Sequence, residues 1–202
     1  MSGKRGLVCG WGINDADYVV TPLISGKQVW CKYYQLWKNM IQRGFDDKSK
    51  QRRPTYRDVT VCDGWQYFMT FRKWATEYEL RYDVDIGELQ LDKDILVNGN
   101  NVYNPSTCCF VNNITNTFLI NCTSARGDYL VGVCWDKRGC KFRSQCHNLF
   151  TGKQEFLGCF TNELEAHRVW QSRKHELALQ LAEEQHDPRV AQALRERYAP
   201  DK

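Results

Sequence analysis

The chain has 202 residues and a formal net charge of +4, from 28 Lys and Arg against 24 Asp and Glu. Hydrophobic residues make up 42% of it and aromatic residues 13%, a composition that excludes a disordered protein and suffices for one or two small domains with a core. This mild charge permits an acidic partner such as nucleic acid without requiring one.

The chain shows no sign of a membrane or secretory destination. No apolar run is long enough to span a bilayer, and residues 1–5 lead into no signal-peptide core. We therefore expect a cytoplasmic protein, in the host cytoplasm if the source is viral, with no membrane partner. The 10 Cys should then be free thiols. No Cys-x-x-Cys is present, so a structural zinc is not expected, and Cys62 and Cys108 would be its first candidate ligands.

Residues 1–28 read as an irregular segment, and the first strong periodicity follows them. Apolar side chains recur at three- and four-residue steps in residues 29–45, which predicts an amphipathic helix ending near Gly44. Residues 46–54 form an expected polar loop with four cationic side chains. The loop is either simply solvated or contacts phosphate.

A strand is expected over residues 56–62 and a helix, capped by Asp63, over residues 64–75. Aromatic residues recur every three positions along this helix, which indicates either a buried face or a surface that stacks bases. A short strand is expected over residues 78–82, within a charged connection.

The next segment predicts two strands and a short helix. Residues 91–96 and 102–111 are strand-like, and the Asn- and Gly-rich residues 98–101 suit the turn between them. Asn112 or Asn113 can cap a helix that carries Asn116 on its first turn. Strand, turn, strand and short helix is the outline of a ββα unit.

Four sequence blocks in residues 29–118 resemble a phage-encoded HNH-like family of the homing-endonuclease type. They are Trp37-x-x-Met-x-x-Arg, Val61-Cys-x-x-Trp-x-x-Phe-x-x-Phe, Leu91-Asp-Lys-Asp and Tyr103-x-Pro-x-x-Cys-x-Phe. The resemblance implies phosphodiester hydrolysis with Mg²⁺ or another divalent metal. Carried over by position, Asp92 would be the catalytic metal carboxylate and Asn116 the metal ligand from the helix, with Asn113 as second choice.

Lys93 stands where that family places its general-base His. A solvated Lys has a pKa near 10.4, so acting as a base at pH 7 needs a shift of about three units, or roughly 4 kcal/mol. Asp92 and Asp94 flank Lys93 and favour its charged form. Either the enzyme nicks DNA through Asp92, Lys93 and Asn116 without a His, or the ββα unit survives only as a scaffold. The chemistry favours the scaffold.

The C-terminal half predicts a small antiparallel sheet followed by helices. Strands are expected over residues 131–135, 140–146 and 155–160, with turns at 136–139 and 148–152. A helix capped by Thr161 or Asn162 should run to about residue 185. Asp187 and Pro188 should start a second, short helix.

Five spaced elements in residues 129–176 resemble the APETALA2-type DNA-binding domain. They are Gly132-Val-x-Trp, Lys141-Phe-Arg, Gly152-Lys, Leu157-Gly-x-Phe and Glu165-Ala. The resemblance implies a sheet in the major groove. Its candidate DNA contacts are Trp135, Lys141, Arg143 and Gln145, with Lys137, Arg138 and Lys153 near phosphates. Val131 and Cys134 stand where the plant-type pattern has Arg, so base preference does not carry over. The alternative is that Trp135 packs on the helix and the cations are solvated.

These predictions combine into an α+β protein. A degenerate ββα (HNH-like) unit with flanking helices is followed by a three-stranded antiparallel sheet packed on a helix. The expected divisions are an irregular segment 1–28, an HNH-like module 29–123, an APETALA2-like domain 124–185 and a short helix 186–202. The expected function is double-stranded DNA binding with weak or lost nuclease activity. The alternatives are an active metal-dependent nicking endonuclease and a phage protein that binds a host factor; the oligomeric state is open.

Overall fold

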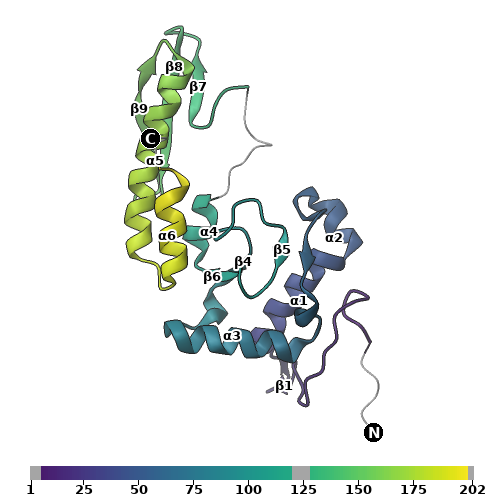
Figure 1. The fold of residues 1–202 in the computed structure, drawn as a ribbon. Coiled ribbons are helices and arrows are strands. Elements are labelled where there is room, and N and C mark those ends of the chain that lie inside the picture. The colour runs from purple at the N-terminus through teal and green to yellow at the C-terminus, as the bar shows by residue number, and fades with distance from the viewer. Residues whose placement is uncertain (1–5, 120–127, 200–202) are drawn as a thin grey trace. The chain divides into compact units, whose positions relative to one another are not determined.

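The structure, a computed structural model, describes residues 6–119 and 128–199 (Figure 1). It divides the chain into two compact units, residues 1–112 and 113–202. Both units contain helices and strands, so the expected α+β class is confirmed. The expected boundary between residues 123 and 124 lies outside the described residues.

The first unit is built around helices α1 (Lys32–Phe45) and α3 (Phe68–Tyr82). The apolar stripe of α1 and the aromatic face expected after Asp63 form one core. Trp37 donates from Nε1 to the carbonyl of Trp65 at 2.8 Å, and the Trp65 ring meets Phe71 edge-on at 5.2 Å. Trp65, Phe68 and Phe71 are buried, so these rings form core rather than a surface for stacking bases.

The local structure around these helices differs from the expectation in several places. The strand expected over residues 56–62 is reduced to β3 (Thr60–Val61), and α3 begins at Phe68 with Tyr67, not Asp63, as its cap residue. The expected loop contains helix α2 (Asp47–Arg52), whose Asp46 cap accepts from the Ser49 amide at 2.9 Å, and a 3₁₀ turn, η1 (Pro54–Tyr56). The expected strand at residues 78–82 is wrong, because α3 continues to Tyr82. Tyr78 packs edge-on against the Phe110 ring at 5.1 Å, and Asp83 ends the helix with a left-handed φ of 51°. A charged sequence therefore stays helical through tertiary packing.

Further short elements complete the first unit. The 3₁₀ turns η2 (Asp63–Gln66) and η3 (Ile86–Glu88) flank α3. The segment expected to be irregular contains a small hairpin of β1 (Leu23–Ile24) and β2 (Lys27–Gln28). Its Asp15 carboxylate accepts from the Met69 amide at 2.9 Å, in the first turn of α3.

The expected hairpin forms in part. Strand β4 (Gln90–Asp92) pairs antiparallel with β6 (Cys109–Val111). Strand β5 (Val102–Tyr103) instead pairs in parallel with β3 (Thr60–Val61). The short helix α4 (Asn113–Leu119) is present. It is grouped with the second unit, so the strands and the helix of the expected ββα arrangement fall in different units.

The second unit contains the expected three-stranded antiparallel sheet, in the order β7 (Val133–Asp136), β8 (Lys141–Asn148) and β9 (Lys153–Phe160). Helix α5 (Glu163–Glu183) packs along one face, and the Ser144 hydroxyl donates to the Ala166 carbonyl at 2.8 Å. The Glu155 carboxylate on β9 pairs with Arg173 on α5 at 2.7 Å. The sheet is therefore fastened to the helix by polar contacts as well as by apolar burial.

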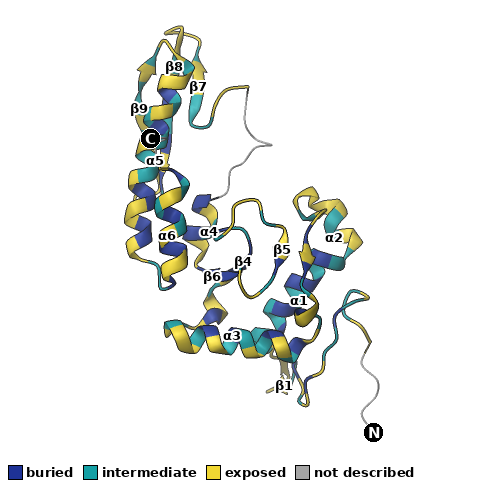
Figure 2. Ribbon diagram, in the orientation of Figure 1, coloured by how far each residue is buried: buried dark blue, intermediate teal, exposed yellow. Residues whose placement is uncertain are grey.

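Both C-terminal helices begin as expected. The Asn162 side chain accepts from the amides of Leu164 and Glu165. Asp187 caps α6 (Pro188–Arg197), with Pro at its first position. Figure 2 shows that α5 and α6 each have a buried and an exposed side. Within the described residues, no helix is long and apolar enough to cross a membrane.

Candidate nucleic-acid interface and the predicted metal site

The sheet of the second unit has one covered face and one open face. Along β8 the side chains of Ser144, Cys146 and Asn148 are buried, because they point toward α5. The alternate side chains, Lys141, Arg143, Gln145 and His147, point the other way and are exposed or partly exposed. The sequence alternation predicted this division for β8.

Strand register places further residues on the open face. Arg143 lies between Cys134 on β7 and Cys159 on β9, and Gln145 lies opposite Phe156. We call the open sheet face the surface formed by Cys134, Asp136, Lys141, Arg143, Gln145, His147, Gln154, Phe156 and Cys159. Its one carboxylate, Asp136, stands opposite Lys141 at the end of β7.

The Arg143 side chain contacts the aromatic ring of Phe156 on the open sheet face. Its guanidinium lies 5.0 Å from the centre of the Phe156 ring, and Phe156 itself is 59% exposed. A cation above an aromatic face gains about 0.5–1 kcal/mol at an exposed site. Within the described part of the chain Arg143 makes no ion pair, so its hydrogen-bond donors remain available to a partner.

Phe156 reaches the open face because of an irregularity in the sheet. The register between β8 and β9 shifts between Ser144 and Gln145, which leaves Leu157 as an extra residue on β9. Gly158, next to it, has a φ of +139°, a conformation that favours glycine. Strict alternation would place Phe156 on the helix side, and for that reason the sequence did not identify it. The sequence feature that could have indicated this irregularity is the Leu157-Gly158 pair, since glycine in a strand often marks a bulge.

The other predicted DNA contacts lie elsewhere on the unit. Trp135 pairs with Phe142 on the face of Ser144, so the structure does not bring it together with Arg143; its ring meets Phe142 edge-on at 4.8 Å and is 38% exposed. Lys137 and Arg138 lie in the turn between β7 and β8, and Lys153 starts β9 at the other end of the sheet. Lys141, Arg143 and Gln145 are the predicted contacts that share the open face.

Asp92, the predicted metal carboxylate, stabilises a turn. Its Oδ1 accepts from the backbone amides of Asp94 and Ile95, each at 2.8 Å. Burial, followed by the negative charge of Asp94, raises the pKa of Asp92 to about 6, and the two amide bonds only partly oppose the shift. One oxygen of this carboxylate is therefore already used by the turn, and burial makes its ionised form less favourable than that of an exposed Asp.

Lys93 is turned into the same loop. The side chain is 11% exposed, and its ammonium donates to the Asn100 carbonyl at 2.9 Å and to Asp94 Oδ2 at 3.2 Å. The Asn100 amide in turn donates to the Lys93 carbonyl at 2.6 Å. These hydrogen bonds join the two ends of the loop formed by residues 93–100. Lys93, at the predicted general-base position, therefore has a structural role.

The predicted metal donors come from two elements. Asp92 lies at the end of β4, and Asn113 and Asn116 lie on α4. Over residues 6–119 and 128–199, no three His, Cys, Asp or Glu side chains gather where a cation could bind. Cys62 and Cys108 are free thiols, and burial raises the pKa of Cys108 to about 12.

Comparisons of the chain with protein-family models, with curated proteins and with solved structures found no match.

Proposed function

We propose that this protein binds double-stranded DNA through the open sheet face of its second unit. The observation that carries the proposal is the exposed Arg143, supported by Phe156 and free of any ion pair in the described residues. Lys141 and Gln145 stand beside it on the same strand and the same face. The opposite face is packed on α5, which keeps this arrangement rigid without a ligand.

The chemistry of this face suits a DNA groove. A guanidinium can form two hydrogen bonds to the O6 and N7 atoms of guanine, and a Gln amide can do the same with adenine. Lys141 and the turn residues Lys137 and Arg138 supply positive charge for the phosphates. A narrow sheet of this kind is one of the structures that enters the major groove.

We further propose that the first unit contributes little or no nuclease activity. Asp92 supports a backbone turn, and Lys93 is held by carbonyl and carboxylate oxygens. A general base must be free to accept a proton, whereas the Lys93 ammonium is a donor to the Asn100 carbonyl and to Asp94. The loop geometry favours a scaffold over an active site.

The test is the salt dependence of duplex binding by the full-length protein. If Lys141, Lys137 and Arg138 neutralise phosphates, the plot of log affinity against log salt should fall with a slope of about −3. The Lys141→Ala protein should give a shallower slope. A slope near zero would reject DNA as the partner and favour an apolar protein interface.

A further inference from the structure

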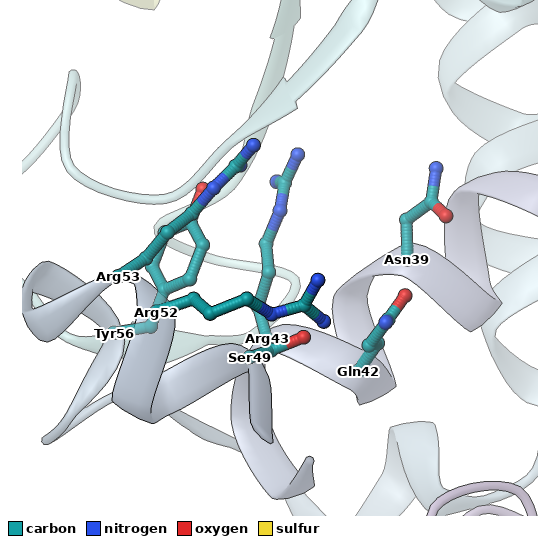
Figure 3. A pocket seen from close by; sticks show the side chains of 7 residues that line it. All are labelled: Asn39, Gln42, Arg43, Ser49, Arg52, Arg53 and Tyr56. Carbon is teal, nitrogen blue, oxygen red and sulfur yellow. The ribbon is translucent and has the colours of Figure 1, made fainter. Parts of the chain in front are cut away.

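The first unit contains a basic pocket that the proposed DNA-binding face does not use. The pocket has a volume of about 460 Å³ and is formed by the end of α1, by α2 and by η1. Figure 3 shows the side chains that line it, which are Asn39, Gln42, Arg43, Ser49, Arg52, Arg53 and Tyr56. No carboxylate is among them. We call this the arginine pocket.

Three guanidinium groups surround the arginine pocket, and none of them makes an ion pair in the described part of the chain. In the described chain, none of Arg43, Arg52 and Arg53 has a carboxylate oxygen within 4 Å. Two acids stand at the start of α2: the Asp46 side chain caps the helix through the Ser49 amide, and Asp47 does not line the pocket. Like charges gathered in one concave site repel one another, and a bound anion would relieve that repulsion.

The surrounding structure holds these cations in place. Tyr56 lies between two of them, with its ring centre 5.8 Å from the Arg43 guanidinium and 5.9 Å from that of Arg53. Arg43 also donates from Nη1 to the Tyr103 hydroxyl at 3.0 Å. Arg52 donates from Nε to the Lys48 carbonyl at 3.3 Å, which leaves its two terminal nitrogens without a hydrogen bond in the described structure. Arg43 is therefore positioned before any ligand arrives, whereas Arg52 and Arg53 are exposed side chains that contact the backbone of α2 and the Tyr56 ring.

We propose that the arginine pocket binds a phosphate group carried by a nucleotide. Guanidinium forks match phosphate oxygens, and three of them exceed what a single carboxylate would need. The Ser49 hydroxyl adds a further polar group, and the Asn39 carbonyl accepts from Gln35 at 2.8 Å, which leaves its amide NH₂ to face a sugar or base. The volume admits more than a bare phosphate ion. The phosphate belongs either to a free nucleotide or to the end of a nucleic-acid strand.

Isothermal titration of the full-length protein at low salt tests the assignment. The probes are inorganic phosphate, adenosine 5′-monophosphate and uncharged adenosine. The monophosphate and phosphate should bind, and adenosine should not. Replacing Arg52 and Arg53 by Gln should weaken monophosphate binding at least about tenfold, since a hydrogen bond to a charged group contributes about 1.5–3 kcal/mol.

Two controls separate recognition from misfolding and from bulk charge. Lys48→Gln removes an exposed cation from α2 that does not line the pocket, and it should leave affinity unchanged. Arg43→Lys keeps the charge of the half-buried member but loses the fork, and it should weaken binding if the geometry matters. Circular dichroism checks that each variant is folded.

The two sources of phosphate are distinguished by a 5′-phosphorylated single strand, compared with the same strand carrying a 5′-hydroxyl. Tighter binding of the monophosphate than of either strand assigns a free nucleotide, and tighter binding of the phosphorylated strand assigns a strand end. The Arg143→Ala protein should give the same pocket affinities, so this result is independent of the sheet. The proposal is overturned if no phosphate-bearing probe binds, if adenosine binds equally well, or if the Arg52 and Arg53 double variant binds as the parent does.

Discussion

The proposed DNA binding by the open sheet face depends most on two side chains, Arg143 and Phe156, which contact each other. An unsupported Arg loses rotamer freedom when it binds a base, and a ring beneath the guanidinium reduces that cost. Only one of these two residues could be predicted from the sequence. Strand alternation identified Arg143, whereas Phe156 depends on a bulge in β9 that alternation does not reveal.

Phe156→Leu should weaken duplex binding by about twofold to fivefold, because a cation–ring contact at an exposed site contributes about 0.5–1 kcal/mol. Fluorescence anisotropy of labelled duplex DNA measures this change. Phe150→Leu is the matched control, since Phe150 is 42% exposed in the turn before β9, away from the open face. Equal losses in both variants would show that Phe156 has no special role beneath Arg143.

Asp92 gives a residue-scale prediction for the first unit. Its pKa is raised from 3.8 to about 6, so the folded state retains a proton that the unfolded chain releases. Stability should therefore fall as pH rises from about 4 to 6 and stay lower above that window. Asn at this position keeps an oxygen for the amides of Asp94 and Ile95 without the charge.

Asp92→Asn should accordingly be more stable than the parent at pH 7, by roughly 1–3 kcal/mol, and similar to it near pH 4. Urea denaturation at both pH values measures the difference. A variant less stable than the parent at pH 7 would mean that the ionised carboxylate is favourably paired in the native protein, which the turn-supporting role does not include.

At the scale of elements, periodic segments were predicted well and pairing choices were not. The helices α1, α5 and α6 and the strands β7 to β9 were found because alternation and capping residues act locally. The extension of α3 was missed because packing of Tyr78 on Phe110 overrides a charged sequence. The pairing of β5 with β3 was missed because the partner of a two-residue strand is decided by tertiary contacts.

The entry into β7 depends on a glycine. Gly132 has a φ of +79°, and a Cβ built there would lie 2.1 Å from the Trp170 ring on α5. Gly152, in the turn before β9, has a similar φ of +66° with open space around it. The two positions share backbone strain and differ in steric clash.

Gly132→Ala should therefore destabilise the second unit by about 3–5 kcal/mol, whereas Gly152→Ala should cost only about 1–2 kcal/mol of left-handed strain. Hydrogen exchange of β8 amides in the full-length protein reports the stability of this unit. Similar losses for the two variants would show that the Trp170 ring moves aside at little cost.

For the whole molecule, the two units divide the proposed roles. The second carries the proposed DNA-binding face, and the first carries a hydrogen-bonded loop at the position where the sequence predicted a nuclease centre. Of the predicted site, the shared face of Lys141, Arg143 and Gln145 followed from the sequence. The engagement of Asp92 and Lys93 did not, because hydrogen bonds across a loop leave no periodic signal.

This division predicts binding without cleavage. Supercoiled DNA incubated with the protein in Mg²⁺ or Mn²⁺ should be retarded on a gel but not nicked, and chelation of the metal should leave retardation unchanged. Asp92→Asn should behave identically. Nicking by the parent that is lost in the variant would make Asp92 a metal ligand and reject the scaffold role.

The most direct test of the central claim compares Arg143→Ala with Arg168→Ala in a duplex-binding titration. Both variants remove one exposed cation from the second unit, and Arg168 lies on α5, away from the open sheet face. We predict that the Arg143 variant loses at least about tenfold in affinity, the scale of one bidentate base contact, while the Arg168 variant stays within about twofold. Unchanged affinity in a folded Arg143→Ala protein would contradict the account.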